Sequence, residues 1–126
     1  MNQHKSHRIL FVCLGNICRS PAAEAVFKAK AKLQGIDVFV DSAGTSAWHQ
    51  GEKADSRMRQ AAAARGYQIT SFSRPFNRND FQNFDLIVAM DDLNFDELKE
   101  KALTSEEDQK IVRMRDFLRH HRSDHI

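Results

Sequence analysis

Four short apolar runs are spaced along the chain, and longer stretches that mix apolar and polar residues separate them. The first run is short, continuous and rich in branched and aromatic residues, which is typical of a buried strand. The expected strands cover residues 8–12, 38–40, 85–89 and 111–114. Helices in the stretches between them are indicated by the residues that begin and end a helix.

Helix signals do occupy the stretches between these runs. Pro21 stands where a first helical turn tolerates a residue without an N–H group, and Gly35 follows the last apolar position of that stretch. Asp55 is a candidate N-cap for a second helix, and Asp91 or Asp92 begins a third. The expected helices cover residues 20–33 and 56–65 and a stretch through Leu93, Leu98 and Leu103, with a short turn at 79–83. This order predicts an α/β fold with one doubly wound, four-stranded parallel sheet and helices on both faces.

Composition and charge exclude several classes of protein. With 126 residues, of which 41% are hydrophobic, the chain can build one core. The net charge of +2, without a dense Lys/Arg block, gives no reason to expect a nucleic-acid partner. The longest apolar run, residues 9–14, is too short to span a membrane, so no membrane partner is expected. We expect residues 1–7, which are polar, to form a flexible arm ahead of a domain that covers residues 8–126.

Both cysteines of the chain lie in the loop that follows the first strand, between Cys13 and Ser20. Two cysteines in one loop are not a secreted disulfide framework, so we expect a cytoplasmic protein. The carboxyl ends of parallel strands are also where such folds place their ligand crevices. Gly15 and Asn16 allow several backbone N–H groups to turn toward one centre, at which the next helix also aims its N-terminus. Arg19 adds a planar fork suited to two phosphate oxygens, so the pattern predicts a phosphate loop after the first strand.

Cys13 is the candidate nucleophile of this loop. The helix dipole and Arg19 both favour its thiolate over its thiol, and a thiolate in a phosphate-shaped cradle can attack a phosphoryl group. Ser20 is placed to hydrogen-bond the sulfur and to help release it from a phosphocysteine. The loop lacks the Gly-Lys-Ser/Thr ending of a nucleotide-binding loop, and two cysteines without a suitably spaced histidine are a poor zinc site. The alternative is that Cys13 and Cys18 are small buried apolar residues, but the spacing Cys-x5-Arg-Ser between a strand and a helix favours catalysis.

Three segments resemble the low-molecular-weight protein tyrosine phosphatases, in their bacterial form. VCLGNICRSP resembles their phosphate loop, DSAGTSAWHQGEKAD resembles the segment that comes next, and FDLIVAMDDLN resembles their third strand and the start of the following helix. The resemblance runs from Arg8 to Leu118. It implies hydrolysis of phosphotyrosine through a phosphocysteine, without a metal or another cofactor. The implied partners are tyrosine-phosphorylated proteins, such as a bacterial tyrosine kinase.

The resemblance also implies a role for each residue of the site. Cys13 would attack phosphorus, and Arg19 would bind the phosphate and stabilise the transition state. Asn16 would brace the loop in a strained conformation, with Ser42 in its supporting network, and asparagine does tolerate left-handed backbone angles. The phosphate oxygens would be held by backbone N–H groups of Leu14, Gly15, Asn16, Ile17, Cys18 and Arg19.

Two further roles follow from the resemblance alone. Cys18 would form a reversible disulfide with Cys13 under oxidising conditions. Trp48 would form a wall of the pocket for the phenyl ring, and the alternative is that it is a core tryptophan.

The chain departs from the family at the general acid, which is an aspartate followed by proline on a loop after the fourth strand. The two prolines of this chain, Pro21 and Pro75, do not follow an aspartate, and Asp116 and Asp124 lack the flanking pattern. We expect the natural protein to continue past Ile126 to this acid and to a last helix, and the alternative is a true truncation. The family often carries a histidine near Ser71, and this chain has none there.

Two other functions compete with a phosphatase. An arsenate reductase of the same fold needs additional cysteines downstream, and none follows Cys18. A non-catalytic or acid-deficient relative that binds phosphate or phosphotyrosine would keep the cradle without turnover. The intact pair of Cys13 and Arg19 argues against such a binder, and the missing acid argues for it.

Overall fold

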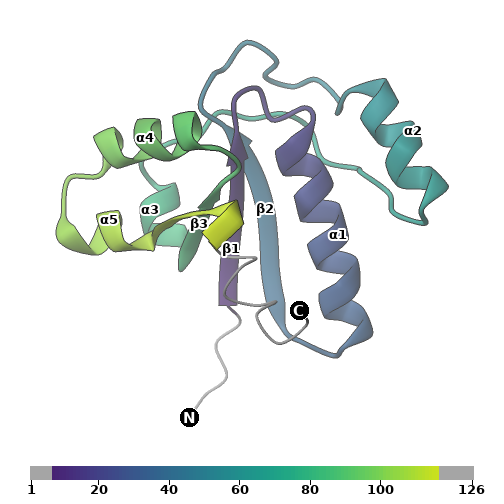
Figure 1. Ribbon diagram of the computed structural model, residues 1–126, viewed down its shortest axis with the longest axis horizontal. Helices are drawn as coiled ribbons and strands as arrows, with labels where there is room; N and C mark the ends of the chain where they lie inside the picture. The colour runs from purple at the N-terminus through teal and green to yellow at the C-terminus, as the bar shows by residue number, and fades with distance from the viewer. Residues whose placement is uncertain (1–6, 117–126) are drawn as a thin grey trace.

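The computed structural model describes residues 7–116, and these form a four-stranded parallel sheet with helices packed against it (Figure 1). The elements are β1 (His7–Cys13), α1 (Arg19–Leu33), β2 (Val38–Gly44), α2 (Ser56–Ala64), α3 (Asp80–Asn83), β3 (Leu86–Ala89), α4 (Asp92–Lys101), α5 (Ser105–Lys110) and β4 (Ile111–Arg113). The expected doubly wound parallel sheet is therefore confirmed. No helix within residues 7–116 has both the length and the apolar character that a membrane span requires.

Strand β1 lies in the interior of the sheet, whose order is β2-β1-β3-β4. Its residues pair in parallel with β2 from His7 to Cys13 and with β3 from Ile9 to Val12. The chain therefore extends the sheet first to one side of β1 and then to the other. Ligand crevices form where the strand order reverses in this way, and Cys13 ends β1 at that point.

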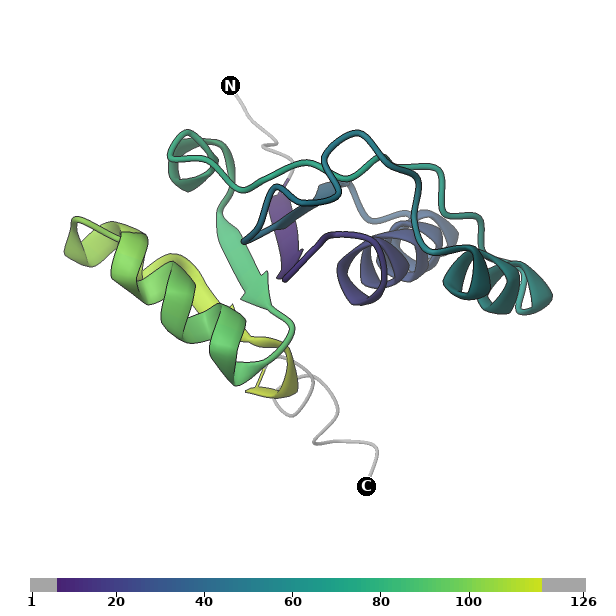
Figure 2. The ribbon, with the colours of Figure 1, turned by 90° about the horizontal axis from the view of Figure 1, so that it is seen from above.

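The two faces of the sheet are covered by different helices. Figure 2 shows α1 and α2 on one side of the sheet and α3, α4 and α5 on the other. Because side chains alternate along a strand, Phe11 packs on the side of α1 with Phe27, whereas Leu10 and Val12 pack on the side of α4 with Leu98. This double cover explains why β1 is apolar at successive positions.

The structure differs from the sequence expectations at two elements. Strand β2 was expected to end at Val40, but it continues to Gly44 because every residue of it pairs with β1. The helix expected to pass through Leu103 ends at Lys101 instead. Thr104 then caps a separate helix, α5, by accepting a hydrogen bond from the N–H of Glu107 at 3.1 Å.

The expected arm falls almost wholly outside the described residues. Its last residue, His7, already pairs with Val38 in the sheet. Asp124, Ile126 and the three histidines near the end of the chain also lie outside the described range.

Leu98 and Leu93 offer a matched test of the packing of α4. The side chain of Leu98 is fully buried against the sheet, whereas Leu93 on the same helix is 61% exposed. We expect Leu98→Ala to lower the free energy of unfolding by about 2–5 kcal/mol, because it leaves a cavity in the core. Leu93→Ala should change it by less than about 0.5 kcal/mol. Urea unfolding measures both, and equal effects would contradict the assignment of Leu98 to the core.

Candidate active site

Residues 14–18 form the phosphate loop between β1 and α1, at the end of the sheet that Figure 1 shows at the top. Asn16 has a φ of 59°, the single positive φ among the non-glycine residues described, as the sequence analysis expected. No side chain within residues 7–116 caps the N-terminus of α1. The first N–H groups of this helix therefore stay available to a ligand.

The backbone carbonyl groups from Cys13 to Ile17 belong to the same peptides as the N–H groups of residues 14–18, and most of them are held by donors from other segments. Four of them accept hydrogen bonds from donors outside the loop and outside α1. The pairs are Cys13 with the N–H of Thr45 (2.9 Å), Leu14 with the N–H of Ser46 (2.9 Å), Gly15 with Oγ of Ser73 (2.8 Å) and Ile17 with the N–H of Asp55 (2.7 Å). Three separate segments thus hold this loop from outside.

The backbone N–H groups of the same loop have no such partners. From Leu14 to Cys18, none of them donates a hydrogen bond to any acceptor within residues 7–116. In a trans peptide the N–H group points away from the preceding carbonyl group, so carbonyls held outward direct N–H groups inward. Together with the N-terminus of α1, these groups form a site for an anion.

The sulfur of Cys13 lies in a buried hydrogen-bonded group with Ser20 and Asn16. The Sγ atom of Cys13 is 3.0 Å from Oγ of Ser20, and Nδ2 of Asn16 donates to the same Oγ at 2.9 Å. An amide NH₂ group can only donate, so the hydroxyl of Ser20 accepts from Asn16. Its own proton can go to the sulfur or to the carbonyl oxygen of Ala43 at 3.5 Å, and the sulfur is the nearer of the two. The expected contact between Ser20 and Cys13 is therefore present.

The hydrogen bonds of Asn16 differ from the expected network. Its Oδ1 atom accepts from the backbone N–H of Arg74 at 3.0 Å, so both ends of the amide are used. Ser42, expected in this network, instead donates its hydroxyl to Oε1 of Glu24 at 2.6 Å. The reason is the alternation of β2, because Ser42 lies on the face of Val40 and hence faces α1.

Arg19 is held at the edge of the site by Asp91. Its Nη1 atom donates to Oδ2 of Asp91 at 2.9 Å, while Oδ1 of Asp91 caps α4 by accepting from the N–H of Asn94 at 2.9 Å. Partial burial raises the pKa of Asp91, but the Asn94 N–H and the Arg19 guanidinium outweigh burial and leave this pKa below its usual value. The cap confirms that the helix expected to begin at Asp91 or Asp92 is capped by Asp91, and the ion pair adds a contact that sequence reasoning missed.

Cys18 differs from Cys13 in its surroundings. Burial, followed by the negative charge of Asp55, raises the pKa of the Cys18 thiol, so this residue stays protonated at neutral pH. Both cysteines are free thiols in the structure. The disulfide implied for them stays a prediction.

Trp48 belongs to a loop that lies over the phosphate loop. Its side chain is 83% exposed, which excludes a core tryptophan. The neighbouring ring of His49 lies so close to Gly15 that a Cβ atom added to Gly15 would be 2.9 Å from its Cδ2 atom. A place for Trp48 in the wall of a substrate pocket stays a prediction.

Arg74 anchors a part of the site that the sequence analysis did not find. Its guanidinium makes two hydrogen bonds of 3.1 Å to Asp80 and pairs with Asp41 at 3.1 Å. Burial lowers the pKa of Arg74, but the hydrogen bonds and charges of these two carboxylates outweigh burial and raise it. Its backbone contact with Asn16 joins residues 58 positions apart, so no local pattern could have indicated it.

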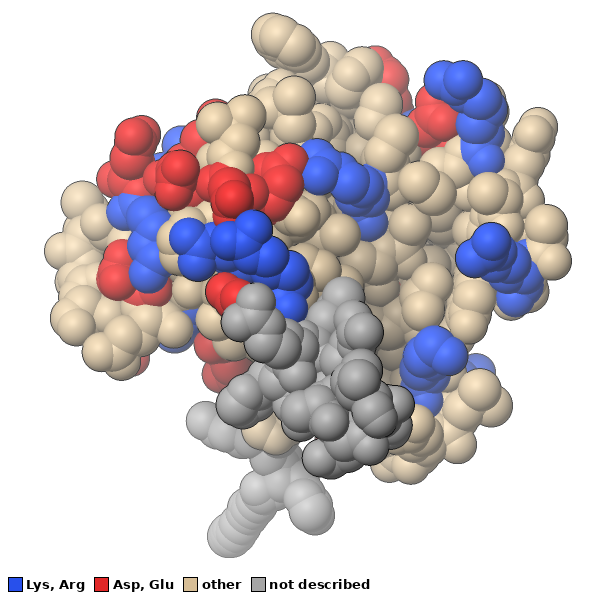
Figure 3. Space-filling model, viewed as in Figure 1, with Lys and Arg blue, Asp and Glu red and all other residues tan. Residues whose placement is uncertain are grey.

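Charged side chains next to the site are interleaved rather than segregated. Over α4 and β4, acidic and basic side chains lie beside one another (Figure 3). Asp92 pairs with Arg113 at 2.9 Å and with Arg115 at 3.3 Å. Within residues 7–116, no group of three or more His, Cys, Asp or Glu side chains could hold a metal ion.

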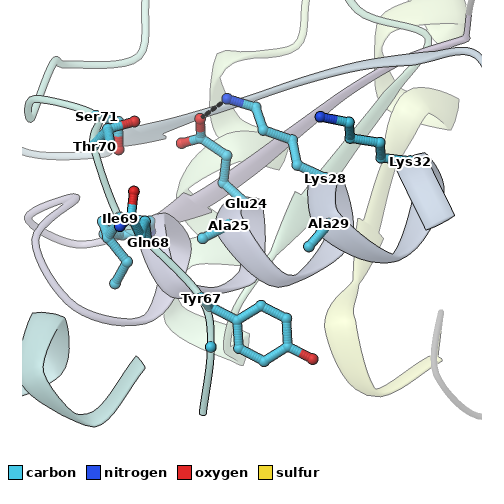
Figure 4. A pocket seen from close by; sticks show the side chains of 12 residues that line it. Glu24, Ala25, Lys28, Ala29, Lys32, Tyr67, Gln68, Ile69, Thr70 and Ser71 are labelled. Atoms are coloured by element: carbon cyan, nitrogen blue, oxygen red, sulfur yellow. Dashed lines mark hydrogen bonds and ion pairs between the residues drawn. The ribbon is translucent and has the colours of Figure 1, made fainter. Parts of the chain in front are cut away.

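A cavity of about 380 Å³ lies beside the site, between α1 and residues 66–71. Figure 4 shows the carboxylate of Glu24 in this cavity, where it accepts a hydrogen bond from Nζ of Lys28 at 2.9 Å. The lining includes Pro21, which follows Ser20 in the chain, but not the phosphate loop itself. The cavity is therefore separate from the anion site at the loop.

Substitution of Gly44 tests the close contact between β2 and the phosphate loop. A Cβ atom at this position would lie 2.7 Å from the carbonyl oxygen of Leu14 and 3.1 Å from the backbone nitrogen of Asn16. We expect Gly44→Ala to displace the loop and to weaken the binding of inorganic phosphate at least about tenfold, measured by calorimetry. Gly35→Ala is the control, because its positive φ costs stability while its open surroundings leave the loop alone. Unchanged phosphate affinity in Gly44→Ala would contradict this geometry.

Because Asp91 forms an ion pair with Arg19, we expect Asp91→Asn to lower the free energy of unfolding by an amount that depends on pH. Asparagine keeps the cap of α4 but loses the charge that faces Arg19, so the variant should be less stable at neutral pH. Because the pKa of Asp91 is lowered by folding, its contribution is complete above its unfolded pKa of about 3.9 and disappears as the pH falls through the folded value. Urea unfolding should thus show a constant difference between pH 5 and 7 that shrinks below about pH 4. A difference that persists to about pH 2 would refute this role of the charge.

Comparison with known proteins agrees with this geometry. A family model described as low molecular weight phosphotyrosine protein phosphatase matches residues 8–126. A low molecular weight protein-tyrosine-phosphatase of Streptomyces coelicolor is 41% identical over 114 residues, which are 89% of this chain and 70% of that protein. A putative member from Synechocystis is 48% identical over 90 residues, 70% of this chain and 57% of that protein. The chain thus spans between about half and three quarters of the length of these relatives.

Solved structures of phosphatases are also similar to the fold of this chain. A protein tyrosine phosphatase of Entamoeba histolytica, with Hepes in its active site, aligns with a TM-score of 0.86 and 51% identity over 89% of this chain and 72% of that one. A Drosophila arginine phosphatase aligns with a TM-score of 0.81 and 36% identity over 94% of this chain and 76% of that one. The chain belongs to the low molecular weight phosphotyrosine protein phosphatase family.

Proposed function

We propose that the protein hydrolyses phosphotyrosine in protein substrates through a phosphocysteine on Cys13. The observation that carries this proposal is the run of unpartnered N–H groups from Leu14 to Cys18, within residues 7–116, beside the buried sulfur of Cys13. Such a run binds a phosphoryl group, and the family of the chain supports phosphoryl chemistry rather than simple anion binding.

In the first step the thiolate of Cys13 forms a bond to phosphorus as the bond from phosphorus to the tyrosine oxygen breaks. The electron pair of that bond leaves with the oxygen, which then takes up a proton. The inward N–H groups and Arg19 bind the three remaining phosphate oxygens as charge develops on them. Asp91 holds one nitrogen of Arg19, and the other nitrogens of the guanidinium make no hydrogen bond within residues 7–116, so they can face the phosphate.

In the second step water attacks phosphorus and the bond from sulfur to phosphorus breaks. The electron pair returns to the sulfur of Cys13, and inorganic phosphate leaves. The hydroxyl proton of Ser20, 3.0 Å from the sulfur and left free by the donor from Asn16, stabilises the departing thiolate. Ser20 therefore acts on both steps through the charge of the sulfur.

The residue that gives a proton to the tyrosine oxygen is left unassigned. Among residues 7–116, Asp116 is the candidate proton donor that follows β4. Its carboxylate is 3.5 Å from Arg113, which favours a structural ion pair instead. A relative that binds phosphotyrosine without efficient turnover is therefore the alternative. An arsenate reductase is disfavoured, because both cysteines of the chain lie in the phosphate loop and none follows Cys18.

Exposed apolar side chains near the loop support an aromatic substrate. Leu14 is 43% exposed and Trp48 is 83% exposed, so both can contact a phenyl ring above the phosphate site. The protein partners are then tyrosine-phosphorylated proteins, with an autophosphorylated bacterial tyrosine kinase as a specific candidate. The free thiols of Cys13 and Cys18 fit a reducing cytoplasm and a protective disulfide under oxidation.

The test compares wild type with Cys13→Ser and Cys18→Ser on an activated aryl phosphate and on a phosphotyrosine peptide. Cys13→Ser should lower turnover by at least about 10⁴-fold, since it removes the nucleophile. Cys18→Ser, whose side chain has no part in turnover here, should keep most of it. Trapping of a phosphorylated Cys13 by rapid acid quench would identify the intermediate.

Each other outcome assigns a different function. Turnover that survives in Cys13→Ser would refute the nucleophile. Phosphopeptide binding without turnover in wild type would favour the binder. A phosphoarginine peptide tested in parallel and preferred over the phosphotyrosine peptide would place the chain with its Drosophila relative.

A further inference from the structure

Ser73 is a buried residue that contacts two functional segments at once. It is 4% exposed, and its Oγ atom donates to the carbonyl oxygen of Gly15 at 2.8 Å. Its backbone N–H donates to the carbonyl of Glu52, and its carbonyl accepts from the N–H of Gly51, both at 2.8 Å. Ser73 thus joins the loop that carries Trp48 to the phosphate loop.

The hydroxyl of Ser73 controls the direction of one peptide group in the cradle. The carbonyl of Gly15 and the N–H of Asn16 belong to the same peptide and point in opposite directions. A donor on this carbonyl therefore keeps the N–H of Asn16 directed inward, where it can bind an anion. Of the four donors from outside the loop and α1, those of Thr45, Ser46 and Asp55 are backbone groups, whereas Ser73 uses its side chain.

This peptide needs an external donor more than its neighbours do. Gly15 has no side chain to restrict its backbone, and Asn16 holds a positive φ of 59°. Rotation of the peptide would turn the Asn16 N–H outward and the Gly15 carbonyl inward, where its oxygen would repel a phosphate. Loss of the Ser73 hydroxyl leaves this carbonyl without its donor, which removes the resistance to that rotation.

We propose that Ser73 is a positioning residue that orients the Gly15–Asn16 peptide for phosphate and couples this orientation to the loop that carries Trp48. Its role rests on the proposed function of the loop. The backbone N–H of Arg74 supports it from the next position, because it donates to Oδ1 of Asn16 at 3.0 Å. Two consecutive residues of one segment thus fix two consecutive residues of the phosphate loop.

The experiment compares Ser73→Ala with Ser71→Ala, whose hydroxyl lies two residues away in the same segment and makes no hydrogen bond within residues 7–116. Calorimetry gives the dissociation constants of inorganic phosphate and of vanadate, a mimic of the transition state. Ser73→Ala should weaken phosphate about tenfold and vanadate more, because the inward N–H groups matter most as charge develops. Ser71→Ala should change neither, and Ser73→Thr, which keeps the hydroxyl, should restore binding.

A purely structural role would lower the melting temperature of Ser73→Ala without changing either dissociation constant, and that result would overturn the proposal. So would a Ser73→Thr variant that folds but binds like Ser73→Ala. If Ser73→Ala does not fold, Ser73→Cys replaces it, since its thiol has a similar volume and is a weaker donor. That variant should also weaken vanadate more than phosphate, and unchanged constants would again overturn the proposal.

Phosphate binding separates this proposal from the proposed function. If wild type binds phosphate but turns over no phosphotyrosine, the proposed catalysis fails while the role of Ser73 in the cradle is still measured. If wild type turns over normally and Ser73→Ala binds phosphate and vanadate as wild type does, the role of Ser73 fails alone. A protein NMR spectrum that shows the Asn16 amide shifted in Ser73→Ala, and unshifted in Ser71→Ala, identifies the peptide that moves.

Discussion

The outward direction of the carbonyl groups in the phosphate loop is the constraint on which the rest of the site depends. A short loop that turns five N–H groups toward one point must place the matching carbonyls somewhere, and buried carbonyls need donors. Donors from Thr45, Ser46, Asp55 and Ser73 meet that need for four of the five matching carbonyls. If these donors were removed, the buried carbonyl groups would be left without hydrogen bonds, and the conformation with inward N–H groups would become less stable. Anion binding here is therefore a property of the surrounding segments as much as of the loop.

The fold brings those donors to the loop through the parallel sheet. Strand β2 pairs with β1 as far as Gly44, so the chain leaves the sheet directly beside Leu14 and offers its next two N–H groups to the loop. The absence of a side chain at Gly44 allows this approach. The segment that contains Arg74 then packs against Gly44, whose N–H donates to the carbonyl of Arg74 at 2.9 Å. Ion pairs of Arg74 with Asp41 and Asp80 anchor this segment. On the β3 side, Asp91 caps α4 and holds Arg19 with the same carboxylate, which ties helix geometry to the cation of the site.

Sequence patterns were sufficient for the features that depend on neighbours in the chain. The apolar run before Cys13, the first helical turn with Pro21 and the asparagine at position 16 each indicate local backbone structure, and each was confirmed. Sequence patterns failed where pairing between distant residues determines the local structure. Asp41 and Ser42 look unlike a strand but extend β2 because β1 lies beside them. Ser73 carries no local signal, since its contact with Gly15 joins positions 58 residues apart. The partner of Ser42 was missed for the same reason.

The central claim is that the N–H groups of residues 14–18 form the anion site. The most direct measurement follows the backbone amide signals of the wild-type protein by NMR during a titration with inorganic phosphate. The account predicts that the amides of residues 14–18 and of the first turn of α1 shift together, with one dissociation constant. If phosphate shifts a different set of amides and leaves those of the loop unchanged, the claim is contradicted.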